Sequence, residues 1–105
     1  MKQDKIWYKN LINKKQGVLG ICLVKRGFEA YFHQHEEAEV YFFLYGVGRT
    51  FFNNEEHIIQ SPDIVHIKGN TLHCMTPISR YVLLLYYFPE GPFEKIEYKY
   101  TSLKL

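Results

Sequence analysis

Two histidines and one glutamate have the spacing needed to bind a metal ion together. His33 and His35 are separated by one residue, and Glu39 follows His35 by four positions. Side chains at positions i and i+2 of a β-strand point to the same face, so both imidazoles can reach one ion. Glu39 can join them if the chain turns or bulges at residues 36–38 and re-enters the sheet as the next strand. Two nitrogen donors and one oxygen donor that converge in this way form a half-site for a divalent metal.

The rest of the chain has the pattern of short β-strands that could position such a site. Short apolar runs recur between turn residues, and no segment repeats apolar residues at helical spacing over several turns. Strands are predicted at 5–8, 18–25, 28–33, 37–45, 49–52, 56–60, 64–67, 74–75 and 81–88, with 93–100 as a final edge strand or tail. Residues 9–17 are predicted to be a polar connector, and residues 46–48 a tight hairpin turn. About eight to ten short strands with this spacing predict an all-β barrel or double-sheet roll.

Length and composition predict one domain spanning residues 1–105. Eight Phe and nine Tyr favour a β-rich, well-packed chain. The formal charge is +2 and the basic residues form no cluster, which argues against a nucleic-acid partner. No apolar run reaches the roughly 18 residues of a membrane helix, and residues 1–8 lack the apolar segment of a secretory leader. We therefore expect a cytoplasmic protein with a small-molecule partner, no nucleic-acid or membrane partner, and no fused DNA-binding domain.

The chain has two cysteines, Cys22 and Cys74. They could form one disulfide, but two lone thiols in a chain without a leader are expected to be reduced and partly buried.

Two of the predicted strands carry apolar or aromatic side chains on both faces. They are residues 37–45, apart from Glu39, and residues 81–88. A strand that is buried on one side only should alternate apolar with polar residues, so the second faces of these strands must be covered. A homodimer that packs sheet on sheet would provide the cover. The alternative is that the chain's own tail covers them.

The spacing of residues 27–46 resembles the first motif of the cupin superfamily. It reads G-x5-H-x-H-x3-E-x6-G, with glycines at 27 and 46 and with His33, His35 and Glu39 at the defined positions. Residues 62–77 resemble the second cupin motif, whose last defined position falls on His73. Pro62, Lys68 and Asn70 stand where that motif has Gly, Pro and Gly. Asn adopts the left-handed conformation more readily than most residues, so these departures concern the shape of the loop more than the histidine.

The resemblance implies a small antiparallel cupin barrel, also called a double-stranded β-helix or jelly roll. It also implies that His33, His35, Glu39 and His73 bind one divalent metal ion inside the barrel. Three imidazoles and a carboxylate suit Fe, Mn, Ni, Co, Zn or Cu, and the donor set does not choose among these metals. Four protein ligands on a six-coordinate metal leave two positions for water, substrate or O₂.

Two further residues are candidates for a catalytic role. Tyr41 lies two positions after Glu39, so its side chain should point into the same cavity, where it could bind substrate or act as a general acid or base. The alternative is that Tyr41 only lines the core. His66 precedes the second motif and could face the pocket; the alternative is a surface position or a satisfied position in the core.

Cupins include isomerases and epimerases, dioxygenases, lyases, decarboxylases and binding modules, so the fold does not define a reaction. The leading hypothesis is a metal-dependent enzyme that acts by Lewis-acid catalysis on a small oxygenated molecule. A sugar or a hydroxy or keto acid would fit, in a reaction of isomerase, epimerase or lyase type. One alternative is an Fe(II)-dependent dioxygenase with the same ligands. The other is a non-catalytic cupin that binds a small molecule.

Overall fold

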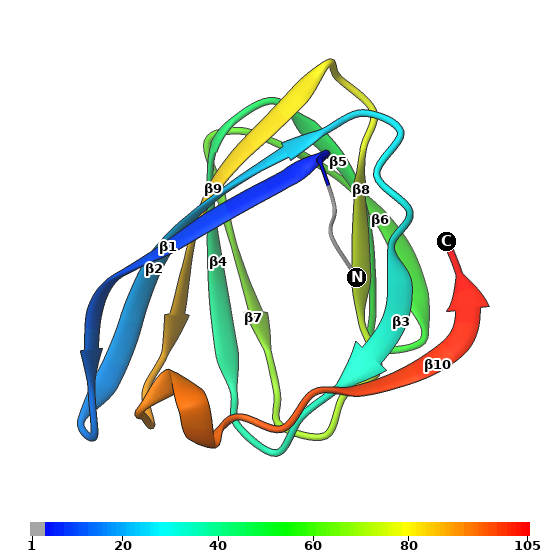
Figure 1. Cartoon of the computed structure of the whole chain (residues 1–105). Coiled ribbons are helices and arrows are strands. Elements are labelled where there is room, and N and C mark those ends of the chain that lie inside the picture. The colour runs from blue at the N-terminus through cyan, green and yellow to red at the C-terminus, as the bar shows by residue number, and fades with distance from the viewer. Residues whose placement is uncertain (1–3) are drawn as a thin grey trace.

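The computed structural model describes residues 4–105 and is built almost entirely from antiparallel β-strands (Figure 1). The elements are β1 (Ile6–Lys14), β2 (Gly17–Lys25), β3 (Tyr31–Gln34), β4 (Glu39–Tyr45), β5 (Val47–Phe52), β6 (Glu55–Gln60), β7 (Asp63–Ile67), β8 (Cys74–Pro77), β9 (Tyr81–Phe88), the 3-10 helix η1 (Phe93–Lys95) and β10 (Lys99–Lys104). One wall of the barrel is a five-stranded sheet in the order β1-β2-β9-β4-β7. The opposite wall consists of the sheets β6-β5-β8 and β10-β3. The predicted all-β antiparallel barrel is therefore confirmed.

The core lies between the two walls and is supplied by every second residue of the central strands. In β2 and β9 buried residues alternate with more exposed ones. Phe43 of β4 and Phe88 of β9 are among the largest fully buried side chains. The register pairs Gly20 with Tyr86, and a Cβ atom at Gly20 would lie 1.9 Å from the Tyr86 ring. Glycine is therefore required at this position, because the ring occupies the space of a side chain.

Turns follow the residues that favour positive φ. Asn53 and Asn54 connect β5 to β6 with φ values of 53° and 60°, which matches the two-residue hairpin loop that such residues favour. Asn70, which replaces the motif glycine, has a φ of 59° and so adopts the left-handed conformation. The tight turn predicted at residues 46–48 is wrong in extent: Gly46 alone bends the chain, with a φ of 97°, and β5 begins at Val47.

The two ends of the chain differ most from the prediction. Strand β1 continues through the predicted polar connector to Lys14 and pairs with β2 along its length. β1 is the edge strand of its sheet, and most of its side chains are exposed. Its sequence is therefore polar and resembles that of a connector. At the other end the predicted strand at 93–100 is a 3-10 helix followed by β10, which pairs with β3. The two cysteines are free and buried.

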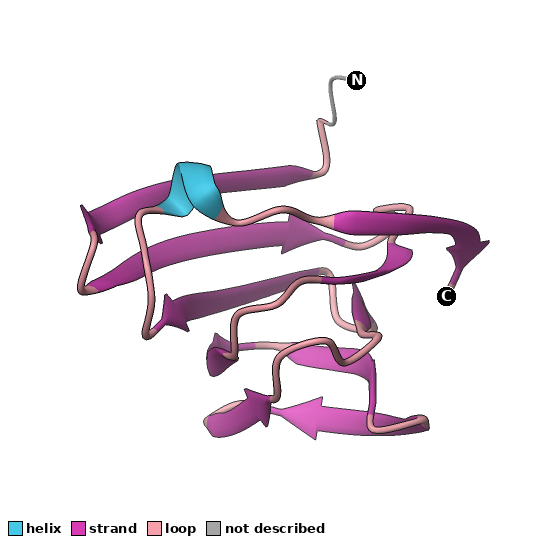
Figure 2. Ribbon diagram, turned by 90° about the horizontal axis from the view of Figure 1, so that it is seen from below, coloured by secondary structure: helices cyan, strands magenta, loops and turns pink. Residues whose placement is uncertain are grey.

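The C-terminal tail does not cover the outer face of the five-stranded sheet. It runs along the open side of the barrel from η1 to β10, beside β3 (Figures 1 and 2). Large apolar side chains remain exposed on the outer face, among them Trp7, Ile64 and Tyr87. The alternative of cover by the tail is therefore wrong for this face.

Within residues 4–105 no helix has the length and apolar character that crossing a membrane requires. Residues 1–3, with which the predicted domain begins, lie outside the described range.

Candidate metal centre

The four predicted ligands come from three separate parts of the sequence. His33 lies in β3, His35 follows that strand directly, Glu39 opens β4, and His73 immediately precedes β8. The backbones of His33 and His73 exchange hydrogen bonds of 3.1 and 2.8 Å. This bridge places the two motifs side by side although they are far apart in sequence.

The side chains of these residues converge inside the barrel. One ring nitrogen from each of His33, His35 and His73 lies within 4.8 Å of the others. The Oε1 atom of Glu39 lies 3.1 Å from Nε2 of His35 and 3.4 Å from Nε2 of His73. Two donors bound at right angles to one ion at about 2.1 Å would be separated by about 3 Å. His35, Glu39 and His73 therefore have spacings that fit adjacent positions around a single ion.

The backbone orients all three imidazoles in the same way. In each ring Nδ1 donates a hydrogen bond to a backbone carbonyl two residues away, at 3.0 Å for His33, 2.9 Å for His35 and 2.7 Å for His73. A carbonyl only accepts, so Nδ1 carries the proton and Nε2 of the neutral ring keeps its lone pair. This second hydrogen bond is the feature that fixes the tautomer of a metal-binding histidine.

Three unprotonated nitrogens beside a carboxylate require a positive charge. His35, Glu39 and His73 are nearly fully buried, with exposed fractions of 1, 3 and 1%. The Nε2 atom of His73 is buried and makes no hydrogen bond with any part of the chain that the structure describes. A proton on one ring neutralises the carboxylate but occupies only one of the three nitrogens, whereas a divalent cation would bind all three nitrogens and the carboxylate. The residues present therefore fit a metal ion.

The pKa values of the site residues reflect this arrangement. Burial is the largest single effect and would raise the pKa of Glu39, but the neighbouring His35 and His73 together outweigh it and lower the value. Burial likewise opposes protonation of His35, yet the hydrogen bond and charge of Glu39 raise its pKa. The pKa of His33 is lowered to about 4, chiefly by burial and then by His73. The centre therefore keeps a carboxylate anion and at least one neutral imidazole well into the acid range.

The structure separates the two predicted catalytic residues. Tyr41 points into the barrel beside the centre: its ring lies 6.4 Å from that of His73, and Glu39 is close enough to affect its phenol. Burial, followed by the charge of Glu39, raises the pKa of Tyr41. His66 is exposed, because its neighbours Val65 and Ile67 occupy the inward positions of β7. Of the positions considered for His66, the structure shows the surface one, and His66 does not face the pocket.

Two residues that the sequence analysis did not single out also lie at the centre. The ring of Tyr98 is 5.0 Å from that of His35 and 5.5 Å from that of His33, and the ring of Tyr100 is 5.2 Å from that of His33. Both come from the C-terminal tail. Their i and i+2 spacing shows that they share one face, but nothing in the local pattern indicates that this face meets β3.

Solved structures with the same fold have low sequence identity to this chain. An RmlC-like cupin from Shewanella frigidimarina aligns with a TM-score of 0.80 at 13% identity, covering 88% of this chain and 82% of that one. The DMSP lyase DddQ from Ruegeria pomeroyi aligns at 0.77 and 20% identity, covering 88% and 50%. Salicylate 1,2-dioxygenase from Pseudoaminobacter salicylatoxidans aligns at 0.82 and 10% identity, covering 98% and 31%. The chain thus spans half the length of that lyase, and these identities establish the fold alone.

No curated protein sequence matches the chain. A family profile does: that of the AraC-like ligand binding domain matches residues 18–101. The matched segment contains both histidine motifs and extends through η1 into β10. The chain therefore belongs to the family of AraC-like ligand-binding domains, in the cupin superfamily.

Proposed function

We propose that the chain is a metal-dependent enzyme acting on a small oxygenated molecule, such as a sugar or a hydroxy or keto acid, in a reaction of isomerase, epimerase or lyase type. The observation that carries the proposal is the convergence of three oriented imidazoles on one buried carboxylate, beside an inward tyrosine. A purely structural core has no need of such a set, because burying these polar groups is costly unless they are paired.

His33, His35, Glu39 and His73 would hold the ion. A bound divalent metal would polarise a carbonyl or hydroxyl of the substrate as a Lewis acid. The phenol of Tyr41 keeps its proton because its pKa is raised, so it would donate a hydrogen bond or a proton to the substrate. The ring of Phe88, 5.3 Å from His35, would help to exclude water from the reacting groups.

A second function is favoured by the family itself, whose description is that of a ligand-binding domain. In this case the same centre would hold a small molecule without converting it.

An Fe(II)-dependent dioxygenase would use the same four ligands, and one neighbour of this fold is a dioxygenase. The three functions differ in turnover and in oxygen consumption, so they can be separated by experiment.

The first experiment is elemental analysis of untagged protein beside the variant His33→Ala/His73→Ala. About one transition-metal ion per chain in the parent, lost in the variant, is expected. The identity of the metal decides which assay follows. If it is iron, substrate-dependent O₂ uptake is measured. If it is zinc or manganese, isomerase and lyase activities are measured on sugars and hydroxy acids. Protein that resists loading with each of the candidate ions would overturn the proposal.

Once a substrate is found, His35→Ala should abolish its turnover and release the metal. His66→Ala is the matched control, because it removes an exposed histidine from the outer face and should leave both unchanged. Full turnover by metal-free His35→Ala protein would exclude a metal-dependent reaction. Binding of the molecule without turnover would establish the binding function instead.

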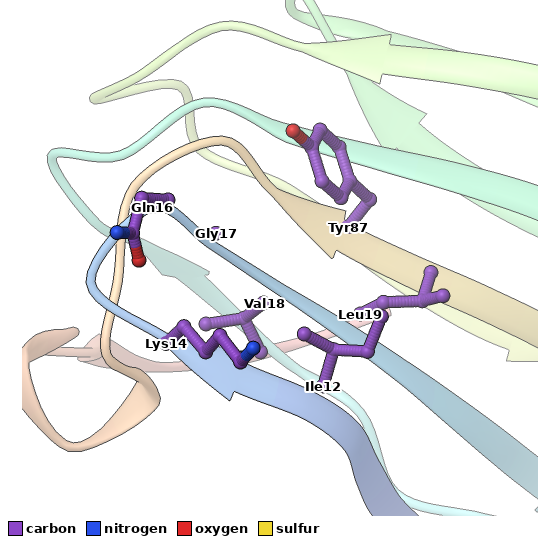
Figure 3. Close-up of a pocket in the computed structure, with 7 residues that line it drawn as sticks. All are labelled: Ile12, Lys14, Gln16, Gly17, Val18, Leu19 and Tyr87. Atoms are coloured by element: carbon purple, nitrogen blue, oxygen red, sulfur yellow. The ribbon is translucent and has the colours of Figure 1, made fainter.

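We also propose that the chain forms a homodimer through the outer face of the five-stranded sheet. The register places Leu85 of β9 between Ile21 of β2 and Phe42 of β4 on this face. A shallow hollow of about 260 Å³ lies at one end of it, lined by Ile12, Leu19 and Tyr87 among others (Figure 3). Five strands at a spacing of about 4.8 Å present a face roughly 20 Å by 25 Å, of the same order as the ~800 Å² that each partner buries in a stable interface.

A further inference from the structure

Three of the four proposed ligands are closed to solvent in this structure. His35 and His73 are each 1% exposed and Glu39 is 3% exposed, whereas His33 is half-buried. The core, including Phe43 and the fully buried Thr50, fills the interior of the barrel. A ligand can therefore contact the three buried ligands only if some covering element moves.

The thinnest cover is the C-terminal tail. Figures 1 and 2 show it crossing the open side of the barrel from η1 to β10, past β3. All six residues of β10 are exposed, and the strand is paired on one side only. In contrast, the neighbouring strands β4, β8 and β9 each contribute buried residues to the core.

The two ends of the tail are held with different strength. At the η1 end the Asn13 side chain accepts a hydrogen bond from the Phe93 amide and donates one to Glu94, and Ile96 is buried. At the β10 end only three register pairs join the strand to β3, with an irregularity between Tyr100 and Lys104. A backbone hydrogen bond of 3.1 Å from Leu105 to Ala30 and a surface ion pair of 3.1 Å between Lys104 and Glu29 add to them, and such exposed ion pairs contribute little. The tail is thus fixed near Ile96 and loosely held beyond it.

Tyr98 lies on the loosely held part and packs against the centre. Its ring contacts the rings of His33 and His35. A phenol in this position can donate a hydrogen bond to an anionic or oxygenated ligand. Tyr41 is close enough to Glu39 and Tyr98 that both affect its phenol.

We propose that residues 97–105 form a hinged cover that swings away from β3 to admit a ligand, and that Tyr98 contacts the bound ligand when the cover closes. This rests on the proposed metal centre and deepens it: Tyr98 becomes a second phenol, beside Tyr41, that positions the small oxygenated molecule.

The contact is tested with Co²⁺-loaded protein and azide, a small anion that takes open positions on the metal and changes its visible spectrum. Tyr98→Phe should keep the metal content and the unfolding midpoint but weaken azide binding at least threefold. Tyr45→Phe is the matched control, because the Tyr45 side chain is 62% exposed and lies at the opposite end of β4 from Glu39, and its azide affinity should not change. Equal azide affinity in Tyr98→Phe and parent protein overturns the contact.

The movement is tested with a disulfide clamp, Gln34→Cys/Lys99→Cys. These residues are register partners on β3 and β10. Opposed residues in antiparallel strands have Cα atoms about 4.5–5.5 Å apart, which suits a disulfide. Capture of Co²⁺ by excess EDTA should be at least tenfold slower in the oxidised clamp than in the same protein after reduction. The single variant Gln34→Cys should match the parent protein under both conditions.

Equal capture rates in oxidised and reduced clamp, with the disulfide verified by mass, would overturn the cover while leaving the metal centre intact. If the clamp does not fold or oxidise, removal of residues 99–105 gives the opposite test, because it deletes β10 from the cover: faster capture supports the cover, and an unchanged rate overturns it. Parent protein that takes up no Co²⁺, or Co²⁺ protein that binds no azide, would overturn the proposed function and this inference with it.

Discussion

At the residue scale, the orientation of the three imidazoles is set by main-chain atoms. Each Nδ1 proton goes to a backbone carbonyl two residues away, so no single side-chain replacement outside the histidines removes the second hydrogen bond. The hydrogen bond that fixes the tautomer is therefore built into the local conformation of the two motifs. The ring of His33 is held in this way although its environment disfavours the protonated form.

His33 gives metal-free protein a specific acid sensitivity. Its folded-state pKa is about 4 against an ordinary value of 6.5, so below pH 6.5 the unfolded chain binds more protons than the folded one. The free energy of unfolding should therefore fall as pH is lowered from 6.5 towards 4. Urea unfolding of EDTA-treated protein at both pH values should show a loss up to about 3 kcal/mol larger in the parent than in His33→Gln. Equal losses in the two proteins would show that His33 titrates normally.

Tyr41→Phe should separate proton donation from core packing. The ring and its contacts with Phe43 remain, so metal content and stability should change little. If Tyr41 acts as an acid or base, kcat should fall by about 10²-fold or more, measured on the substrate identified in the assays above. A variant with unchanged kcat and KM would mean that Tyr41 only lines the core.

At the scale of elements, short apolar runs between turn residues made the central strands predictable. Residues 18–25 and 81–88 were predicted almost to the residue, because both strands bury one face against the core. The spacing of motif one likewise predicted which side chains the structure brings together. Strands β1 and β10 were missed or misplaced, because most of their residues are exposed and their partners are not visible in local sequence. The role of Tyr98 was missed for the same reason, since it depends on the pairing of β10 with β3.

Gly20→Ala tests how tightly β2 packs on β9. The added Cβ would meet the ring of Tyr86 at 1.9 Å, so the ring must leave its place and its 2.6 Å hydrogen bond to Asn10. Overpacking of this kind costs about 1–3 kcal/mol, measurable as a lower urea midpoint. In a Tyr86→Val background the same substitution should cost less than about 1 kcal/mol. If Gly20→Ala lowers the free energy of unfolding equally in both backgrounds, the Tyr86 ring is not the source of the strain.

At the scale of the whole molecule, the proposed interface and the proposed cover lie on opposite sides of the barrel. The outer face of β1-β2-β9-β4-β7 looks away from the interior, whereas β10 and β3 border the open side (Figure 1). A second copy on the sheet would therefore leave the C-terminal cover free to move. No described part of the chain covers the apolar outer faces of β4 and β9. A dimer can therefore bury these faces and still leave the metal centre accessible.

The dimer should be visible as a mass twice the 12.6 kDa of the chain in light scattering after gel filtration. Ile64→Lys/Tyr87→Lys places charges at two exposed positions of the outer face, 57 and 37% exposed, and should give a folded monomer because lysines opposed across the two-fold interface repel and must be desolvated. Ile58→Lys is the matched control, since Ile58 is 58% exposed but lies on β6 in the other wall, and it should remain dimeric. A monomeric parent protein at micromolar concentration would contradict the interface. Dissociation by Ile58→Lys, with the double variant still dimeric, would move the interface to the wall formed by β6-β5-β8.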